Sequence, residues 1–197
     1  MINKYNIKEE KNRIRSLYKE KRSAIPRDIK QIMDSAICKR FLSLSSYRFA
    51  DTILLYSPLK NEIDTLPIAA DALEKGKKIA YPRCIEDNEM VYHYITSTDQ
   101  LTPGKYGIME PSPSLPVFSP EDDSRAVCVL PAIVYDKRGY RLGYGKGYYD
   151  RFLSSFKGTK AGLIYSDFII DRIPVGRFDL SSDVVITEKG VISFAKN

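Results

Sequence analysis

A glycine-rich stretch in the last third of the chain carries the residue types best suited to binding a phosphate group. Gly143, Gly145 and Gly147 alternate, so the backbone there can take positive φ angles and approach a ligand without interference from Cβ atoms. Arg141 and Lys146 add full positive charges to the same stretch. The helix expected to follow it would present backbone N–H groups that attract anions. Together these features predict a phosphate-binding loop.

The spacing of these residues differs from both common nucleotide-binding patterns. A Walker loop has the pattern G-x-x-x-x-G-K-S/T, whereas here Gly147 follows Lys146 and Tyr140 stands five positions before Gly145. The G-x-G-x-x-G spacing of a Rossmann loop is missing as well. The structural alternative is a turn that only connects a strand to a helix. Three alternating glycines, two cations and an acid exceed what such a turn requires, so a phosphate loop is favoured.

Asp150 and the two tyrosines before it could serve either the fold or the ligand. In a structural role, Asp150 would compensate the dipole at the start of the next helix. In a functional role it would hold Mg²⁺ against phosphate oxygens, because Mg²⁺ usually takes one or two carboxylates together with waters and substrate phosphates. Tyr148 and Tyr149 are either core aromatics or side chains that present a ring or hydroxyl group to a ligand.

The elements around the loop indicate where it lies in the fold. Apolar strands alternate with amphipathic helices, which predicts an α/β fold with a mostly parallel sheet covered on both faces. The most apolar run, 126–135, is the expected central strand, and Pro131 within it favours a strand end or bulge. The loop follows at the carboxyl end of this strand, where open α/β sheets bind ligands. The other expected strands are 51–56, 78–81, 89–95, 161–165 and 183–187, and the expected helices lie within 6–44 and at 65–75 and 148–156.

Local signals define the expected ends of several elements. Asn6, with Glu9 three residues later, is typical of a helix start. Gly76 is placed to end a helix, and Pro82 is expected to stop a strand. The proline-rich segment 102–122 is expected to be an ordered loop that crosses the surface, either as a static loop or as a lid.

Length and composition are typical of one domain. A chain of 197 residues buries enough surface to fold without disulfide or metal staples, so we expect a single α/β domain over 1–197 with the N-terminal helices 6–44 packed on the sheet. No apolar run reaches the roughly 18 residues of a transmembrane helix, and the N-terminus lacks the apolar core of a secretory signal. The three cysteines are interpreted as buried reduced thiols. These features predict a cytoplasmic protein with no membrane partner; a monomer is expected, although the sequence does not itself give the oligomeric state.

The net charge of +6 suits either nucleic acid or small anionic ligands such as phosphates. A nucleic-acid-binding module would use the basic N-terminus, with Tyr140, Tyr144 and Tyr148 as stacking platforms. The alternating glycines and Asp150 argue against that module, because a metal-binding acid has no obvious use there. The single histidine, His93, lies in an alternating strand pattern, where a role on the strand surface is favoured over catalysis.

The glycine-rich stretch resembles the signature of a known enzyme family. Residues 139–150 read Gly-Tyr-Arg-Leu-Gly-Tyr-Gly-Lys-Gly-Tyr-Tyr-Asp, which is similar to the signature of 5-formyltetrahydrofolate cyclo-ligases, also called 5,10-methenyltetrahydrofolate synthetases. Segments 11–15, 56–65, 106–111 and 129–136 resemble the family in the same order along nearly the whole chain. The resemblance implies a three-layer α/β/α fold with a mostly parallel central sheet, NagB/RpiA/CoA transferase-like. A sugar-phosphate isomerase is an alternative on a related fold, but the sequence offers no clear acid/base pair for it.

Enzymes of this family close 5-formyltetrahydrofolate to 5,10-methenyltetrahydrofolate, using ATP and Mg²⁺ and releasing ADP and phosphate. The resemblance therefore implies ATP and Mg²⁺ as cofactors. It implies 5-formyltetrahydrofolate, whether or not polyglutamylated, as the partner, and no nucleic acid. The formyl oxygen is expected to attack the γ-phosphoryl group, after which N10 of the folate attacks the formyl carbon and phosphate leaves. No protein nucleophile is required, so the protein's role is positioning and charge stabilisation.

The resemblance also implies roles for individual residues. Lys11 and Arg15 are expected to reach ATP phosphates, and their spacing of four puts both on one helix face; without the family pattern, a solvated basic face would be favoured. Arg141 and Lys146 are the expected catalytic cations. Tyr144 stands where some members carry a basic residue, which could shift how phosphates or folate glutamates are held. The expected ATP-binding residues are Lys11, Arg15, Arg141, Leu142, Gly143, Tyr144, Gly145, Lys146, Gly147, Tyr148 and Tyr149; the folate-binding residues are Ser57, Glu62, Tyr106 and Tyr148; the metal ligands are Asp150 and Asp183.

Overall fold

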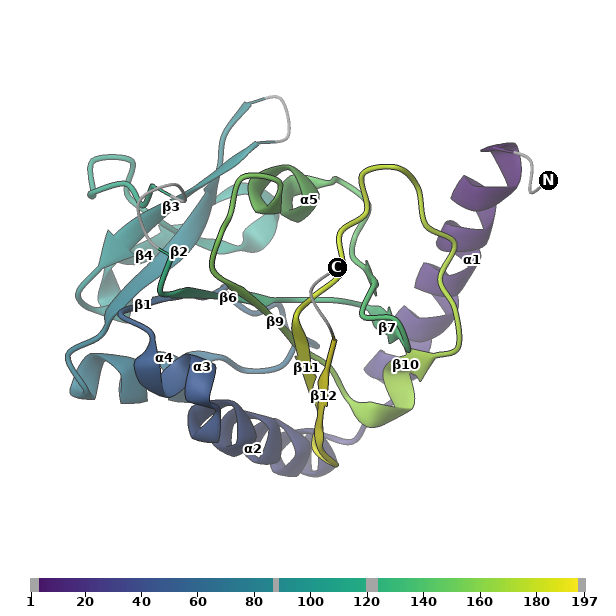
Figure 1. Cartoon of the computed structure of the whole chain (residues 1–197), viewed down its shortest axis with the longest axis horizontal. Helices are drawn as coiled ribbons and strands as arrows, with labels where there is room; N and C mark the ends of the chain where they lie inside the picture. Colours follow the sequence, from purple (N-terminus) through teal and green to yellow (C-terminus); the bar gives the residue numbers. More distant parts are fainter. Residues whose placement is uncertain (1–3, 87–88, 120–123, 195–197) are drawn as a thin grey trace.

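The computed structural model describes residues 4–86, 89–119 and 124–194, and its elements are labelled in Figure 1. The strands of its large sheet are β1 (Thr52–Leu54), β2 (Lys78–Cys84), β3 (Met90–Ile95), β6 (Ala126–Leu130), β9 (Thr159–Leu163), β11 (Val184–Ile186) and β12 (Val191–Ser193). Two small sheets consist of β4 (Leu101–Pro103) with β5 (Met109–Pro111), and of β7 (Val134–Asp136), β8 (Arg141–Leu142) and β10 (Ile169–Ile170). The α-helices are α1 (Lys4–Ser23), α2 (Arg27–Ser43), α3 (Ser45–Phe49), α4 (Leu66–Glu74) and α5 (Tyr148–Leu153).

The large sheet is mostly parallel, as predicted. Its strands follow the order β12-β11-β9-β6-β1-β2-β3. All pairs between β11 and β2 are parallel, whereas the edge strands β12 and β3 run antiparallel to their neighbours. The expected central strand is β6, and it ends directly before Pro131, which confirms that this proline marks a strand end. The prediction of an α/β fold with a largely parallel central sheet is therefore confirmed.

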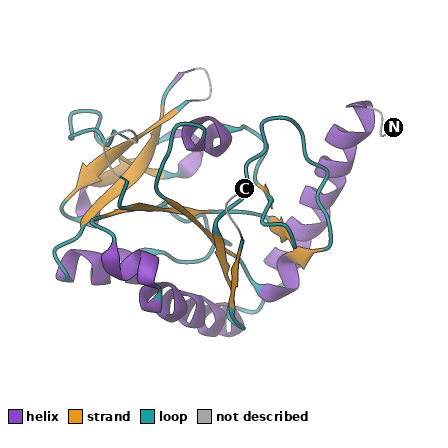
Figure 2. Cartoon of the chain, viewed as in Figure 1, coloured by secondary structure: helices purple, strands orange, loops and turns teal. Residues whose placement is uncertain are grey.

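Helices lie on both sides of the sheet (Figure 2). Side chains alternate along a strand, so neighbouring residues of β6 face different cores. Val127 and Val129 pack in the core that includes Ile37 of α2 and Ile68 of α4. Cys128, which lies between these two valines, packs in the second core, which includes the apolar side chains of α5. This division matches the expected sheet with both faces covered.

The first helix stands beside the small sheet β10-β7-β8 (Figure 1). The rings of Tyr18 and Phe168 lie 5.6 Å apart edge to face, and Nη2 of the buried Arg22 donates a hydrogen bond to the carbonyl of Ile133 at 2.8 Å. The predicted helix start at Asn6 is wrong, because α1 already includes Lys4 and a residue inside a helix cannot cap it.

Pro82 does not stop its strand, contrary to the sequence-based expectation. The carbonyl of Ala80 accepts a hydrogen bond from the Leu55 N–H, so even-numbered residues of β2 direct their backbone polar groups toward β1. The ladder between β1 and β2 ends at the pair of Leu54 with Ala80. The N–H group that Pro82 lacks would therefore face an unpaired side of the strand, where a proline is tolerated. β2 continues to Cys84, paired with β3.

The proline-rich middle segment is more regular than a plain surface loop. Its first part forms the antiparallel pair β4 and β5, joined by a short 3₁₀ turn (Lys105–Gly107) in which Tyr106 has a φ of 61°. Residues 120–123 of the expected loop lie outside the described residues. This hairpin matters for function because its turn reaches the cavity described below.

Single histidine and cysteine residues serve the packing. His93 is 5% exposed rather than a surface residue, and its Nδ1 donates to the carbonyl of Leu115 at 2.8 Å, because a carbonyl oxygen can only accept. The expected placement on the strand surface is therefore wrong, although the residue lies outside the cavity. Cys38, Cys84 and Cys128 are free thiols, and Cys38 and Cys128 are buried as predicted, whereas Cys84 is half-buried in the cavity lining. Among the described helices, none has both the length and the apolar character needed to cross a membrane.

Candidate active site

A cavity of about 460 Å³ lies where the glycine-rich loop meets α1 and the turn between β4 and β5. This volume is within the usual range for small-molecule sites. Segments far apart in the sequence meet here, because the loop follows the small sheet and α1 packs beside that sheet. The structure brings together every expected site residue except Asp183: Lys11, Arg15, Ser57, Glu62, Tyr106 and residues 141–150 all line the cavity.

The glycine-rich loop uses its glycines in two different ways. Gly145 and Gly147 have φ angles of 95° and 74°, which other residues adopt only with strain. Gly143 has no positive φ, so the expectation of positive φ at all three alternating glycines is wrong for this one. A Cβ atom at Gly143 would meet no atom within 4 Å, so the space beside its Cα is open, although its carbonyl is bound by Arg15. The helix α5 begins directly after Gly147.

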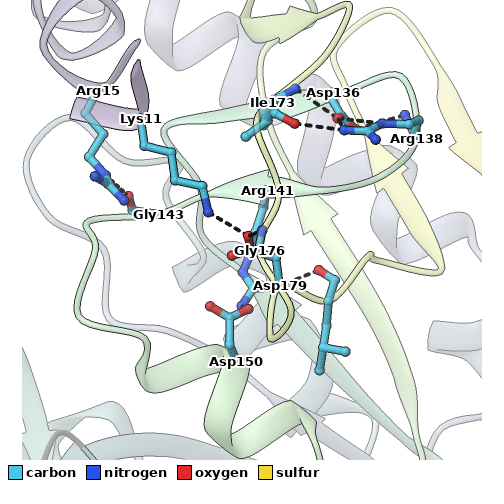
Figure 3. A network of polar contacts seen from close by, with 11 residues as sticks. Lys11, Arg15, Asp136, Arg138, Arg141, Gly143, Asp150, Ile173, Gly176 and Asp179 are labelled. Atoms are coloured by element: carbon cyan, nitrogen blue, oxygen red, sulfur yellow. Dashed lines mark hydrogen bonds and ion pairs between the residues drawn. The ribbon is translucent and has the colours of Figure 1, made fainter. Parts of the chain in front are cut away.

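Arg141 and Asp150 form an ion pair within the cavity lining. Nη2 of Arg141 lies 2.7 Å from Oδ1 of Asp150, and the Arg141 side chain is only 4% exposed. Nη1 of the same guanidinium donates to the carbonyl of Leu180 at 3.4 Å, a long hydrogen bond. The pair thus links β8, α5 and the segment before β11, and it fixes a positive charge beside the loop (Figure 3).

Two cations reach the cavity from α1. Nζ of Lys11 lies 2.6 Å from Oδ2 of Asp179, and Nε of Arg15 donates to the carbonyl of Gly143 at 2.8 Å (Figure 3). Burial lowers the pKa of Arg15 below its ordinary value, and Asp179 opposes this effect. Arg15 also lies against Gly145, since an added Cβ there would come within 3.1 Å of its guanidinium. The expected basic helix face is therefore directed into the cavity.

Glu62 is a buried carboxylate in the cavity lining, 5% exposed. Burial raises its pKa, while the Leu59 N–H at 2.9 Å, the Tyr144 hydroxyl and the charges of Arg22 and Lys30 oppose that rise. Burial also raises the pKa of Tyr144 to about 12, so this phenol is neutral and its hydroxyl donates to Glu62. The side of the cavity around Glu62 thus offers a hydrogen-bond acceptor in an otherwise poorly solvated position.

Aromatic rings cover another part of the cavity. Nζ of Lys146 stands 6.0 Å from the centre of the Tyr106 ring, and a hydrogen bond with Tyr106 raises the pKa of Tyr148. Burial raises the pKa of the nearby Cys84 thiol, so that side chain is not a thiolate nucleophile. Among the described residues, Lys146 has no ion-pair partner, which leaves its charge available to a ligand.

A family model described as the 5-formyltetrahydrofolate cyclo-ligase family matches residues 7–188 of this sequence. The chain belongs to this cyclo-ligase family. A 5-formyltetrahydrofolate cyclo-ligase of Mycoplasma pneumoniae is 29% identical over 91% of this chain and 99% of its own length.

Solved structures of cyclo-ligase relatives agree with this assignment. The NMR structure of an Aquifex aeolicus 5,10-methenyltetrahydrofolate synthetase has a TM-score of 0.81 and 32% identity, covering 95% of this chain and 94% of its own. A 5,10-methenyltetrahydrofolate synthetase from Mycoplasma pneumoniae has a TM-score of 0.74 and 26% identity, covering 91% of this chain and 99% of its own. The resemblance noted in the sequence is therefore confirmed at the level of family and fold.

Asp183 does not join the other predicted residues of the cyclo-ligase site. Its Oδ2 accepts the Lys160 N–H at 2.8 Å, and its Oδ1 lies 3.8 Å from Nζ of Lys160. These contacts tie the amino end of β11 to β9, away from the cavity lining. The structure therefore gives Asp183 a role in strand pairing, and we do not propose it as a metal ligand.

Asp179, four residues before Asp183, is an acid of the cavity that the sequence did not single out. It lines the cavity, pairs with Lys11 and accepts the Gly176 N–H at 2.5 Å. Both aspartates stand in the same polar stretch before a predicted strand, so the sequence offers no signal that separates them. Glu110 also lines the cavity. It lies in segment 106–111, which resembles the cyclo-ligase family, but the sequence alone did not predict it as a site residue.

Proposed function

We propose that this chain closes 5-formyltetrahydrofolate to 5,10-methenyltetrahydrofolate, using ATP and Mg²⁺ and releasing ADP and phosphate. The observation that carries the proposal is one cavity with cations of the glycine-rich loop and α1 in its lining together with the buried carboxylate of Glu62. Such a site suits a nucleotide phosphate chain next to a second, largely apolar molecule with a few polar groups. Membership of the cyclo-ligase family supports the choice of folate as that molecule.

The proposed phosphate-binding groups are Lys11, Arg15, Arg141 and Lys146. They come from α1, β8 and the loop, and all of them line the same cavity. Cations that bind extended nucleic acid usually form a long surface stripe, whereas these converge on one pocket. This arrangement favours a small phosphate ligand over nucleic acid. The open space beside the Cα of Gly143 adds a place where a phosphate can approach the loop closely.

The donor groups present suit Mg²⁺. The carboxylates of Asp150 and Asp179 both line the cavity beside cations that would also contact phosphates. Mg²⁺ usually takes one or two carboxylates and completes its shell with water and substrate phosphate oxygens. The described residues contain no cluster of three metal-binding side chains, so a site here would depend on such oxygens. We therefore propose Asp150 and Asp179 as its protein ligands, where the bound ion would offset phosphate charge.

The protein's own part in the reaction is positioning and charge stabilisation. A formamide oxygen is a weak nucleophile, so its attack on the γ-phosphorus, which breaks the bond to the bridging oxygen and releases ADP, requires the γ-phosphoryl group to be held in line with it. Lys146 and Arg141 would offset the negative charge on the phosphoryl oxygens during this transfer. Glu62 would accept N–H groups of the pterin, whose ring donors suit a carboxylate. N10 then displaces phosphate from the formyl carbon and loses its proton to solvent.

The test is an absorbance assay for the methenyl product. Pure protein is incubated with 5-formyltetrahydrofolate, ATP and MgCl₂, and parallel reactions omit ATP or Mg²⁺. We expect product only in the complete mixture, with ADP and phosphate formed in equal amounts to it. No gain in absorbance in the complete mixture rejects the proposed reaction. Binding to nucleic acid that weakens steeply with salt would instead favour the nucleic-acid-binding alternative.

A further inference from the structure

One buried carboxylate outside the cavity holds the turn that leads into the glycine-rich loop. Asp136, the last residue of β7, is 1% exposed. Its Oδ1 accepts the backbone N–H groups of Arg138 at 2.9 Å and Tyr140 at 3.1 Å. Its Oδ2 accepts Nε and Nη2 of Arg138 at 3.0 and 2.6 Å. A buried charge with this many donors is well compensated, so the turn is rigidly defined.

The side chains of Asp136 and Arg138 also form hydrogen bonds with a second segment of the chain. Oδ2 of Asp136 also accepts the Ile173 N–H at 3.0 Å, and Nη2 of Arg138 donates to the Ile173 carbonyl at 2.8 Å (Figure 3). Both backbone polar groups of Ile173 are thus bound by one ion pair. Ile173 begins the segment 173–182, which leads to β11.

The far end of segment 173–182 returns to the same turn. The Ser182 N–H donates to the carbonyl of Gly139 at 2.9 Å, and Ser181 forms an isolated bridge with Tyr140. Gly139 has a φ of 84°, which lets the turn close between β7 and β8. The segment is therefore a closed loop, attached at both ends to the turn that Asp136 stabilises.

Between these attachments, segment 173–182 carries groups of the cavity. Asp179 pairs with Lys11, and the Leu180 carbonyl accepts the hydrogen bond from Arg141. By contrast, Arg177 and Phe178 at its tip are exposed, and the apolar packing of the segment's middle is the partial burial of Leu180. The attachments at the two ends therefore contribute to the position of Asp179, together with its own contacts to Lys11 and the Gly176 N–H.

We infer that Asp136 and Arg138 are positioning residues: they clamp segment 173–182 so that Asp179, and with it Lys11, is held in place for the nucleotide and its metal ion. The inference rests on the proposed function for what Asp179 and Lys11 bind. The clamp itself rests on the hydrogen bonds of Asp136 and Arg138 to Ile173. Neither clamp residue lines the cavity, so both act through the segment they hold.

The test compares Arg138→Gln with Lys137→Gln. Arg138→Gln removes the guanidinium but leaves Asp136 its three backbone donors, so the fold is retained. Lys137 stands in the same turn, but its ion pair with Asp171 is exposed, 71% and 87% for the two side chains. We expect Arg138→Gln to raise the Kd for Mg·ATP at least about tenfold, as loss of an outer-shell partner does, and Lys137→Gln to leave it unchanged. Arg138→Lys, which keeps one donor, should fall between them.

Two further measurements separate positioning from a general loss of stability. In a double-mutant cycle, Arg138→Gln should weaken Mg·ATP binding less than about twofold when Asp179 is already Asn, because its effect passes through that carboxylate. An undiminished effect overturns the inference.

Amide hydrogen exchange of residues 173–182, measured without ligand, should be faster in Arg138→Gln and unchanged in Lys137→Gln. Unchanged exchange in Arg138→Gln also overturns the clamp, whereas a wild-type chain that binds no Mg·ATP overturns only the proposed function.

Discussion

Nη2 of Arg141 lies 2.7 Å from Oδ1 of Asp150, and the two side chains differ sharply in exposure, 4% against 29%. The cation of this pair is therefore fixed in the protein, while the carboxylate still faces the cavity. A ligand phosphate would meet a charge that needs no reorganisation, which is how electrostatic stabilisation of a transition state is most effective. This relationship separates the two proposed catalytic cations: Arg141 supports the structure as well, whereas Lys146 has no ion pair among the described side chains.

Lys146→Ala is expected to lower turnover at least about tenfold with little change in Tm, because the lost charge acts on the transferred phosphoryl group. Arg141→Ala should lower turnover by at least the same factor but also reduce Tm, since it leaves Asp150 and the Leu180 carbonyl without their partner. The matched control is Lys157→Ala, an exposed lysine outside the cavity lining. Steady-state kinetics and thermal unfolding check all three. Near-normal turnover in both loop variants would remove the proposed role.

Asp179→Asn and Asp183→Asn form a second matched pair, four residues apart. Asp179→Asn should raise the Mg²⁺ concentration needed for half-maximal activity at least about tenfold, because a proposed ligand is lost. Asp183→Asn should leave that concentration unchanged, since an amide oxygen can still accept the Lys160 N–H. Titrating Mg²⁺ at saturating ATP distinguishes them. The opposite order of effects would restore Asp183 as the metal ligand.

Glu62→Gln is expected to weaken folate binding without weakening the fold. Burial raises the pKa of Glu62 in the folded state above its ordinary value of 4.5. At a pH between the unfolded-state pKa and the folded-state pKa, the folded state holds a proton that the unfolded state has lost. Ionised Glu62 therefore lowers stability as pH rises through this window, and the cost is fully present above it. The stability of Glu62→Gln relative to wild type should increase across the same window, as urea unfolding at several pH values would show. A variant that is less stable at neutral pH contradicts this account.

Gly143→Ala and Gly145→Ala should affect different properties. At Gly145 a side chain meets a φ of 95° and the Arg15 guanidinium, so the variant should lose about 1–2 kcal/mol of unfolding free energy. At Gly143 a methyl group would enter open space, so stability should be unchanged. If a ligand phosphate approaches that backbone, the KM for ATP should rise in Gly143→Ala. Equal stability losses in both variants would contradict the distinction.

Sequence patterns predicted the framework because their causes are local. Runs of apolar residues gave the strands that became β1, β6 and β9, and Gly76, at a φ of 68°, follows the helix it was expected to end. The sequence also predicted a phosphate-binding loop, since alternating glycines beside Arg141 and Lys146 have few structural uses. Pro82 was misjudged because its tolerance depends on where the neighbouring strand ends, which is not a local property.

By itself the sequence determined the family, the largely parallel sheet and most residues of the cavity lining. Only the tertiary structure showed that Asp179, and not Asp183 four residues later, lines the cavity. The clamp on Ile173 and the return at Ser182 bring Asp179 to Lys11, while strand pairing draws Asp183 to Lys160. The reason is physical: which acid reaches a cation on another element depends on hydrogen bonds between distant segments, and no local pattern of residue types encodes those.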